Sequence, residues 1–268
     1  MKNEGRKDAS DVTLVQAEPV RVSDPGRLAH LSAHRGLIVR RALLVSAIRG
    51  FFPVPLVDDV LARRVRAGLY QKLASGRQVD LPAESATILA TVKGGAVARL
   101  SLATAAVVVA KFAGRKFLAL LAAGRSAGEM GRTFQSATLF DHYCAKMHVG
   151  GPITVAEASR LRGCLDAVAS DPLSGVVIEA FGEGSRVLGR SLLEAPRWVS
   201  QRIARLGERF VHSGGNPDIL DAFPEEAPGE FAWIDRAAQA VEAAMAQAGN
   251  EHSAQVIQAF EERWKGDP

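Results

Sequence analysis

The chain of 268 residues is 47% hydrophobic and only 6% aromatic, and its formal net charge is +4. Ample apolar content with a low net charge excludes a disordered chain and allows a sizeable core in one or two domains. Its two cysteines, Cys144 and Cys164, exclude a disulfide framework and a four-cysteine zinc site. Alanine, the best helix former, is abundant and favours an all-α fold, a multi-helix bundle with apolar helical hairpins and no substantial sheet.

Charge is distributed unevenly along the chain. Residues 21–132 carry 18 Lys and Arg against six Asp and Glu, a net +12. Residues 213–268 carry three against 11, a net −8. A basic body followed by an acidic tail indicates an anionic partner, pairing of the tail with the body, or both.

The N-terminal part of the chain is expected to contain a flexible lead and two helices. Residues 1–26 form the lead, with scattered charges and two prolines. A first helix is predicted from about residue 28 to residue 49. Pro53 and Pro55 follow it and stop it, because neither can donate a backbone hydrogen bond. A second helix is predicted from near residue 56 to residue 74.

A long apolar stretch with scattered basic residues comes next. It runs from residue 88 to residue 123, after Pro82 opens a short helix. Its longest uncharged run, residues 100–110, has 11 residues, too few to span a bilayer as a helix. Small side chains then recur every four residues and predict the close approach of another helix. These small residues are Ala119, Ala123, Ala127 and Gly131.

Further helices are predicted beyond residue 148. Gly150, Gly151 and Pro152 interrupt the chain, and Thr154 and Glu157 form a capping-box pattern at the next helix start. The predicted organisation has four parts. They are the lead (1–26), a helical domain (27–212, with basic apolar hairpins over 27–148 and central helices over 150–212), an acidic linker (213–230) and C-terminal helices (231–268).

The first candidate functional feature is the corner between the first two predicted helices. Phe51 and Phe52 stand beside two prolines at its tip, and arginines flank it. Such a tip can insert shallowly into a bilayer interface while arginines hold anionic headgroups. The predicted membrane-binding residues are Arg40, Arg41, Arg49, Phe51, Phe52, Arg63, Arg64 and Arg66.

Two alternatives compete with the membrane interpretation of this corner. One is an ordinary helical corner with both phenylalanines in the core and the arginines in solvent. The other is nucleic-acid binding, since clustered arginines suit phosphate. Nucleic acid is disfavoured because the chain has no groove-reading motif and few aromatic side chains for stacking.

The same region resembles a known helical domain. A helix, a Pro-x-Pro with a following acidic residue, and a second helix with Tyr70 near its end resemble the domain of unknown function in YcjF-type membrane proteins and beside some bacterial GTPase domains. The later Gly-rich apolar hairpin, followed by the TFQSAT segment at 133–138, is similar to that domain's second half. EcsC-like proteins share a comparable sequence pattern. The resemblance covers roughly residues 30–148 and implies an all-helical, membrane-associated module without a known catalytic site. The apolar segments here are shorter and more interrupted by charge than spanning helices, which leaves peripheral or re-entrant association.

The second candidate feature is a stripe of possible metal ligands. On a helix, Asp141, Cys144 and His148 share one face at i, i+3 and i+7, and His142 points elsewhere. They would supply three zinc ligands, so a metal-dependent enzyme is one hypothesis. The alternative is a cysteine packed in the core beside polar neighbours. No nucleotide cofactor is expected, because the Gly-rich segment at 182–189 departs from the dinucleotide fingerprint.

Membrane-surface association or scaffolding, rather than catalysis, is the favoured function. The expected partner is anionic lipid, the expected cofactor is none, and the expected location is the cytoplasm, at the inner face of the membrane. The runner-up is a soluble helical module that binds a protein partner or an apolar ligand.

Overall fold

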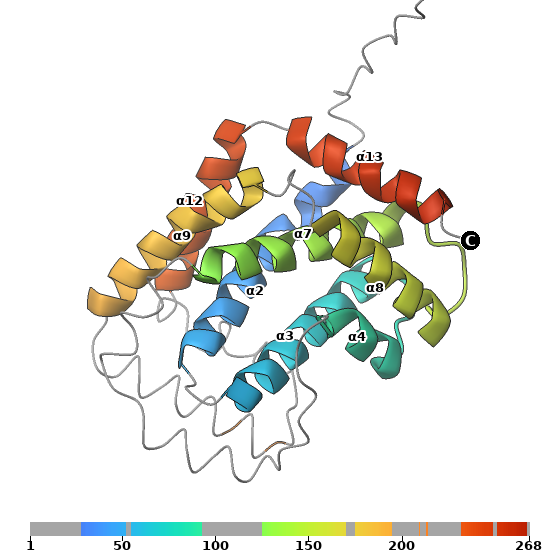
Figure 1. The fold of residues 1–268 in the computed structure, drawn as a ribbon, viewed down its shortest axis with the longest axis horizontal. Coiled ribbons are helices and arrows are strands. Elements are labelled where there is room, and N and C mark those ends of the chain that lie inside the picture. Colours follow the sequence, from blue (N-terminus) through green and yellow to red (C-terminus); the bar gives the residue numbers. More distant parts are fainter. Residues whose placement is uncertain are drawn as a thin grey trace, which may run out of the picture.

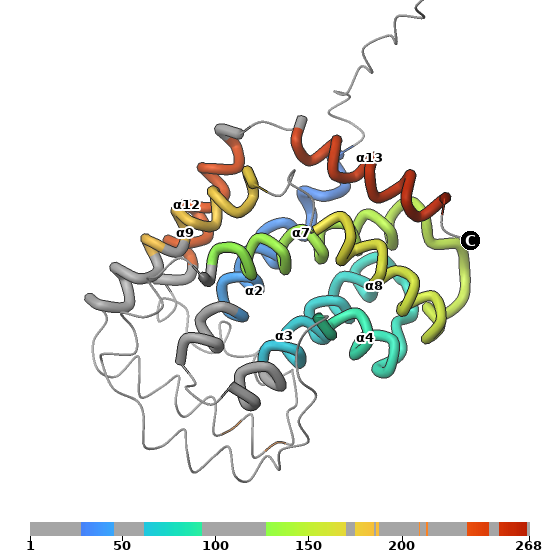
Figure 2. Tube along the Cα trace, in the orientation of Figure 1, coloured from blue at the N-terminus to red at the C-terminus, as the bar shows by residue number. Residues whose placement is uncertain are grey.

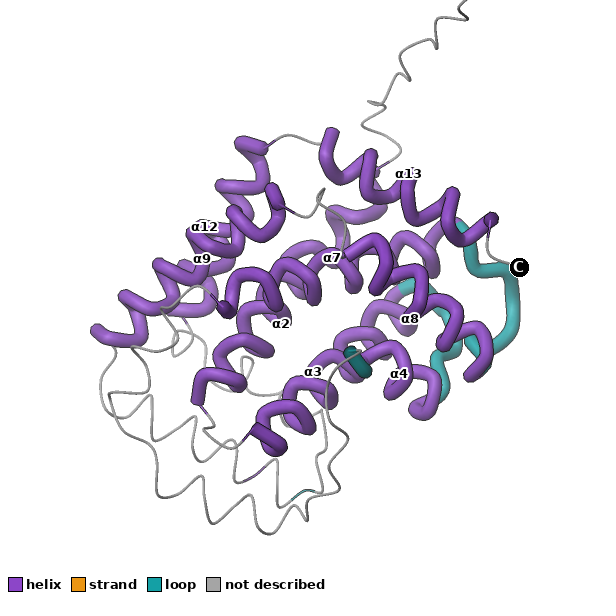
Figure 3. The backbone as a smooth tube through the Cα atoms, viewed as in Figure 1, coloured by secondary structure: helices purple, strands orange, loops and turns teal. Residues whose placement is uncertain are grey.

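A computed structural model describes residues 28–51, 55–92, 125–169, 175–194, 209, 213, 232–248 and 251–266. These residues form eight α-helices and one 3-10 turn, with no strand among them, which confirms the predicted all-α class (Figure 1, Figure 3). The elements are η1 (Ala29–Leu31), α2 (Ser32–Phe51), α3 (Pro55–Gly76), α4 (Ala83–Ala90), α7 (Arg125–Lys146), α8 (Val155–Ala169), α9 (Gly175–Glu194), α12 (Ala232–Ala248) and α13 (Glu251–Gly266).

The helix boundaries follow the prolines and caps of the sequence. Helix α3 begins at Pro55, where a proline is favourable because the N–H at the first helical position has no intrahelical partner. Pro82 is the N-cap residue of α4. At the start of α8, Thr154 Oγ1 accepts a hydrogen bond from the backbone N–H of Glu157 at 3.2 Å, which is one half of the predicted capping box.

Helix α7 runs through the middle of the bundle and contacts α2, α3, α8 and α9 (Figure 2). Between positions 127 and 144, Arg132 is its one exposed residue. Polar side chains are therefore buried on α7 together with apolar ones: Thr133, Gln135, Ser136, Asp141 and His142. Because a buried polar group is costly without hydrogen-bond partners, this helix is where an internal polar network is required.

Apolar contacts fix α7 against its neighbours. Tyr70 of α3 meets Phe140 of α7 edge to face with ring centroids 5.0 Å apart. Gly131 of α7 lies so close to α9 that a Cβ there would be 3.1 Å from Cγ1 of Ile178. The predicted close helix approach is thus present at Gly131, and Ala127 on the same face is buried. Ala119 and Ala123 lie outside the described residues.

The acidic C-terminal helices are part of the same core. Helix α12 packs along α9 and α2, and α13 packs on α8 and α7, as Figure 1 shows. Val241 of α12 and Phe260 of α13 are fully buried. Arg40 of α2 pairs with Asp235 of α12 at 3.1 Å. Helices α12 and α13 therefore pack on the helices that precede them, and Asp235 forms an ion pair with Arg40 there.

Candidate functional site

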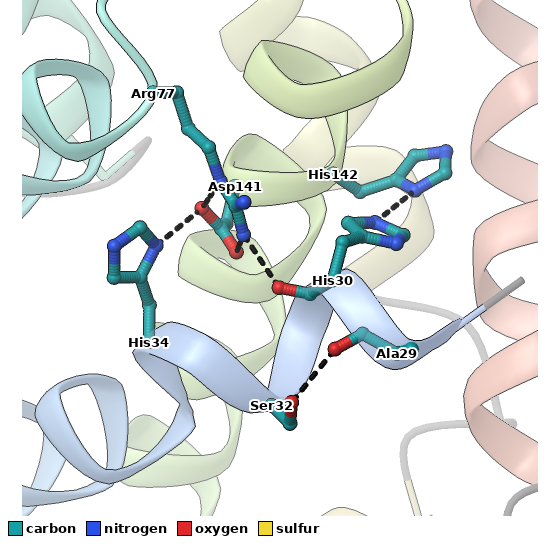
Figure 4. Close-up of polar contacts among 7 residues, drawn as sticks. All are labelled: Ala29, His30, Ser32, His34, Arg77, Asp141 and His142. Carbon is teal, nitrogen blue, oxygen red and sulfur yellow. Dashed lines mark hydrogen bonds and ion pairs between the residues drawn. The ribbon is translucent and has the colours of Figure 1, made fainter. Parts of the chain in front are cut away.

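A buried carboxylate, Asp141, is the centre of a polar network between helices (Figure 4). Arg77 donates two parallel hydrogen bonds to this carboxylate, from Nε to Oδ1 at 2.8 Å and from Nη2 to Oδ2 at 2.7 Å. His34 of α2 adds a third contact, Nδ1 to Oδ1 at 2.8 Å. The Asp141 side chain is 0% exposed, so its charge depends on these partners.

The local sequence places each partner of Asp141. Helix α3 ends at Gly76, and the chain turns there, with Gln78 in the left-handed region at φ 59°. This turn directs Arg77 back to α7. Gly76 also makes room for His34, because a Cβ at position 76 would lie 2.6 Å from His34 Nε2. Arg77 Nη2 further donates to the backbone carbonyl of His30 at 2.6 Å, which ties η1 to the network.

A second chain of contacts, the histidine clasp, consists of His30, His142 and Glu261. His30 Nε2 lies 3.1 Å from His142 Nδ1, and the two rings are 5.2 Å apart (Figure 4). His142 Nε2 lies 3.0 Å from Glu261 Oε1 on α13. The histidine clasp therefore links η1, α7 and α13 through side chains alone.

The electrostatics of this region favour positive charge on Arg77 and disfavour it on His30. Hydrogen bonding to Asp141 raises the pKa of Arg77. Burial lowers the pKa of His30 below the ordinary histidine value, and the nearby charges of His142, Lys146 and Arg77 lower it further. Arg77 therefore serves as a permanent cation, whereas His30 is held neutral at pH 7.

A third polar contact joins the end of α7 to α8. Tyr143 donates its hydroxyl proton to Glu157. His148 Nδ1 lies 3.2 Å from the same carboxylate, and its Nε2 lies 3.0 Å from the Gly151 carbonyl. Burial, followed by the contact with Glu157, raises the pKa of Tyr143. Both ring nitrogens of His148 therefore face oxygen acceptors.

Trp264 packs over this contact from α13. Its ring meets Tyr143 edge to face at 5.0 Å, and the Arg160 guanidinium lies 4.2 Å from its ring centroid. Arg160 Nη2 also donates to the Trp264 carbonyl at 2.6 Å. This tryptophan anchors α13 to the bundle.

The predicted metal ligands do not converge on one point. Asp141 is occupied by Arg77 and His34, and His148 faces Glu157 and Gly151. Cys144 is buried, and burial raises the pKa of its thiol, which disfavours the thiolate a metal requires. Within the described ranges no three His, Cys, Asp or Glu side chains are placed to hold a metal ion. The candidate ligands Asp141 and His148 therefore have other partners, and Cys144 is buried among core residues, as in the alternative of a cysteine packed beside polar neighbours.

The predicted membrane-binding arginines separate into buried and exposed groups. Arg41 and Arg66 are 6% and 4% exposed, so neither residue faces lipid in this fold. Both are therefore removed from the predicted membrane-binding residues. Burial lowers the pKa of Arg41 to about 10. Arg63 is half-buried, and Arg40 and Arg64 are exposed. The side chains of Arg49 and Phe51, at the end of α2, and the whole of Phe52 lie outside the description.

Arg66 has a specific structural role. Its Nη2 lies 2.5 Å from Glu129 in the first turns of α7, and its Nη1 donates to the Ala90 carbonyl at 3.4 Å. A second buried arginine, Arg162 of α8, donates to the Leu89 carbonyl at 2.8 Å. The two guanidinium groups thus bind the carbonyls at the C-terminus of α4, which have no intrahelical donors.

Several network residues escaped prediction from the sequence. His30, His34 and Arg77 carry no spacing that links them to α7, because they lie 64 to 112 positions away from their partners. His142 was expected to point away from the functional stripe, and it is in fact a member of the histidine clasp. The sequence of α7 did contain one signal, because it carries several polar residues among apolar ones. Polar side chains buried on such a helix require hydrogen-bond partners inside the protein.

Across the parts of the chain that the structure describes, no helix combines the length and hydropathy needed to cross a bilayer. The chain matches no protein family model, no curated protein sequence and no solved structure.

Proposed function

We propose that this protein binds the surface of anionic membranes, and that residues 93–124 make the principal contact. These 32 residues contain five basic and no acidic side chains, and the rest are mainly Ala, Val, Leu, Gly and Phe. A segment of this composition combines apolar surface for the bilayer interface with cations for lipid phosphates. Its basic residues are Lys93, Arg99, Lys111, Arg115 and Lys116.

The observation that carries the proposal is the contact of Arg66 with both sides of this segment. Arg66 binds the last carbonyl of α4, at Ala90, and the carboxylate of Glu129 near the start of α7. The C-terminal end of α4 and the first turns of α7, which flank this segment in the sequence, therefore lie beside one buried guanidinium. A basic apolar segment is suited to peripheral attachment at an anionic bilayer surface.

Helices α2 and α3, which flank the predicted corner, both pack against α7. Arg64 is exposed on α3, and Arg63 is half-buried beside it. These arginines supplement the segment, and the proposed lipid contacts at the corner are reduced to Arg40, Arg49, Phe51, Phe52, Arg63 and Arg64.

The expected strength of binding follows from charge. A basic residue near an anionic bilayer contributes about 1 kcal/mol at low ionic strength, so five of them dominate the attraction. Because this term is screened within about a Debye length, binding should fall as salt rises. Electrostatic attachment to a bilayer surface is the binding mode of a peripheral protein.

Co-sedimentation with vesicles tests the proposal. The full chain is mixed with phosphatidylglycerol–phosphatidylcholine vesicles and, separately, with phosphatidylcholine vesicles at low salt. We expect sedimentation with the anionic vesicles alone. Changing the five basic residues of 93–124 to Gln should weaken it by more than about tenfold.

A matched control removes five exposed charges elsewhere. This variant changes to Gln the residues Lys72, Arg132, Arg186, Arg209 and Arg236, all of which are exposed. It has the same net charge as the test variant, and we expect it to bind almost as the parent does. No binding to anionic vesicles, or an equal loss of binding in both variants, would contradict the proposal. Either result would favour the alternative of a soluble helical module that binds a protein partner or an apolar ligand.

A further inference from the structure

We propose that the histidine clasp of His30, His142 and Glu261 is an acid-operated latch, which holds η1 on α7 and α13 at neutral pH and releases it when both imidazoles are protonated. The basis is the geometry of three groups on three separate elements, with contacts of 3.1 and 3.0 Å. This inference is independent of membrane binding.

The hydrogen bonds of the histidine clasp fix where its protons are. A carboxylate can only accept, so His142 donates from Nε2 to Glu261. The neutral His142 ring then has a lone pair on Nδ1, which accepts from Nε2–H of His30. One proton on each ring therefore satisfies every contact of the histidine clasp.

The latch opens only when both rings carry an extra proton. One extra proton leaves the contact between the rings intact, because a single N–H still points at a single lone pair. A second extra proton places N–H against N–H at 3.1 Å and makes both rings cationic. The contact then becomes repulsive, since neither nitrogen can accept.

The charges around the two rings are mainly positive. Arg77 from α3 and Lys146 from α7 lie close enough to lower the pKa of His30, whereas Asp141 opposes them. Asp141 is already committed to Arg77 and His34, and Glu261 also faces Lys265 at 3.8 Å. Among the described residues, the ionisable groups that act on the two rings include Arg77, Lys146, Asp141 and Glu261. The second proton therefore enters a site that already holds an excess of cations.

The direction of the pH effect follows from the lowered pKa of His30. A histidine whose pKa is lower in the folded state than in the open state stabilises the fold at neutral pH. That contribution is lost as the pH falls below the ordinary histidine value of about 6.5. The latch is therefore closed at pH 7 and opens in mild acid.

Element η1 has little buried surface. None of its three residues is buried, and Leu28 and Leu31 pack against the core but are only partly buried. The hydrogen bond from Arg77 to the His30 carbonyl is a further tie to the bundle. Elements with this little buried surface open at low free-energy cost, so loss of the ring contact should expose the backbone here.

Hydrogen exchange detected by mass spectrometry provides the test. Protection factors of peptides covering residues 28–36 are measured on the full chain between about pH 7.5 and pH 5. We expect protection in the parent to fall by up to about tenfold per pH unit once the second of the two rings takes up its extra proton. His30→Gln retains an N–H donor and takes up no proton, so its protection should stay nearly constant.

His252→Gln is the matched control. His252 lies on α13 outside the histidine clasp, and burial lowers its pKa too. This variant should lose protection in acid as the parent does. Parallel loss in His30→Gln and the parent, or no loss in the parent, would overturn the latch.

A measurement on the unmodified chain decides the question if His30→Gln fails to fold. Nuclear magnetic resonance titration of the imidazoles should place the pKa of His30 below 6.5, with His142 responding to the same step. A pKa of His30 at or above 6.5, or two independent titrations, would overturn the latch.

Discussion

Arg77 and Asp141 form a two-point ion pair, at 2.8 and 2.7 Å, between the end of α3 and the centre of α7. The carboxylate is fully buried, while the Arg77 side chain retains 17% exposure. Through the same guanidinium the pair also holds the His30 carbonyl. Three elements distant in sequence therefore depend on one aspartate.

Asp141→Asn should destabilise the fold by about 3–5 kcal/mol, because it leaves the Arg77 cation without its buried partner. Urea unfolding followed by circular dichroism measures the change. The matched control is Asp235→Asn, whose carboxylate is 49% exposed and pairs with the 60% exposed Arg40. That variant should lose no more than about 1 kcal/mol. Equal losses would show that Asp141 is not the anchor described.

Two glycines on α9 give a prediction about packing. Gly184→Ala should destabilise the fold by about 1–3 kcal/mol, because its Cβ would collide with Val241 and lie 3.3 Å from the Ala237 carbonyl on α12. Gly182→Ala, two residues away, meets nothing within 4 Å and should stabilise the helix by up to about 1 kcal/mol. Thermal unfolding of the two variants compares them. A stabilising Gly184→Ala would contradict the close α9–α12 contact.

Most of the fold was predictable because its signals are local. Prolines and glycines mark where helices stop, and the α2–α3 corner and the cap at Thr154 follow from them. The small-residue pattern also indicated a close helix contact, which Gly131 makes. Such signals depend on residues a few positions apart, and a single sequence contains them.

The site was not predictable in the same way. Asp141 was read with Cys144 and His148, its neighbours on one helix face, whereas its partners come from α2 and α3. Arg41 and Arg66 were read as surface cations because arginine is usually exposed, and burial of Arg66 requires an acid 63 positions away. Long-range pairing decides these roles, and periodicity along one helix does not encode it.

Gln135 of α7 gives a prediction about buried polar groups. Gln135 is 3% exposed, and neither the nitrogen nor the oxygen of its side-chain amide has a hydrogen-bond partner among the described residues. Gln135→Met should therefore raise the free energy of unfolding by about 1–2 kcal/mol. The exposed Gln239→Met should leave it within about 0.5 kcal/mol. Destabilisation by Gln135→Met would indicate that the amide is hydrogen-bonded to internal water.

Two arginines of α3, Arg64 and Arg66, allow stability to be tested separately from lipid binding. Arg66→Gln should cost about 3–5 kcal/mol, because it leaves Glu129 and the end of α4 without their cation. Arg64→Gln, at an exposed position, should leave stability nearly unchanged and weaken sedimentation with anionic vesicles severalfold. Denaturant unfolding and vesicle binding are measured on both variants. The reverse pattern would restore Arg66 to the lipid-contact set and remove Arg64 from it.

The most direct test of membrane attachment places an environment-sensitive dye in the middle of residues 93–124. Val109→Cys is labelled selectively, because the native Cys144 and Cys164 are 7% and 1% exposed. Val149→Cys, at a site 92% exposed on the loop after α7, is the matched control. We predict that anionic vesicles shift the emission of the dye at position 109 to shorter wavelength and leave the dye at position 149 unchanged. An unshifted dye at position 109, at a lipid concentration that sediments the chain, would contradict the proposed role of this segment.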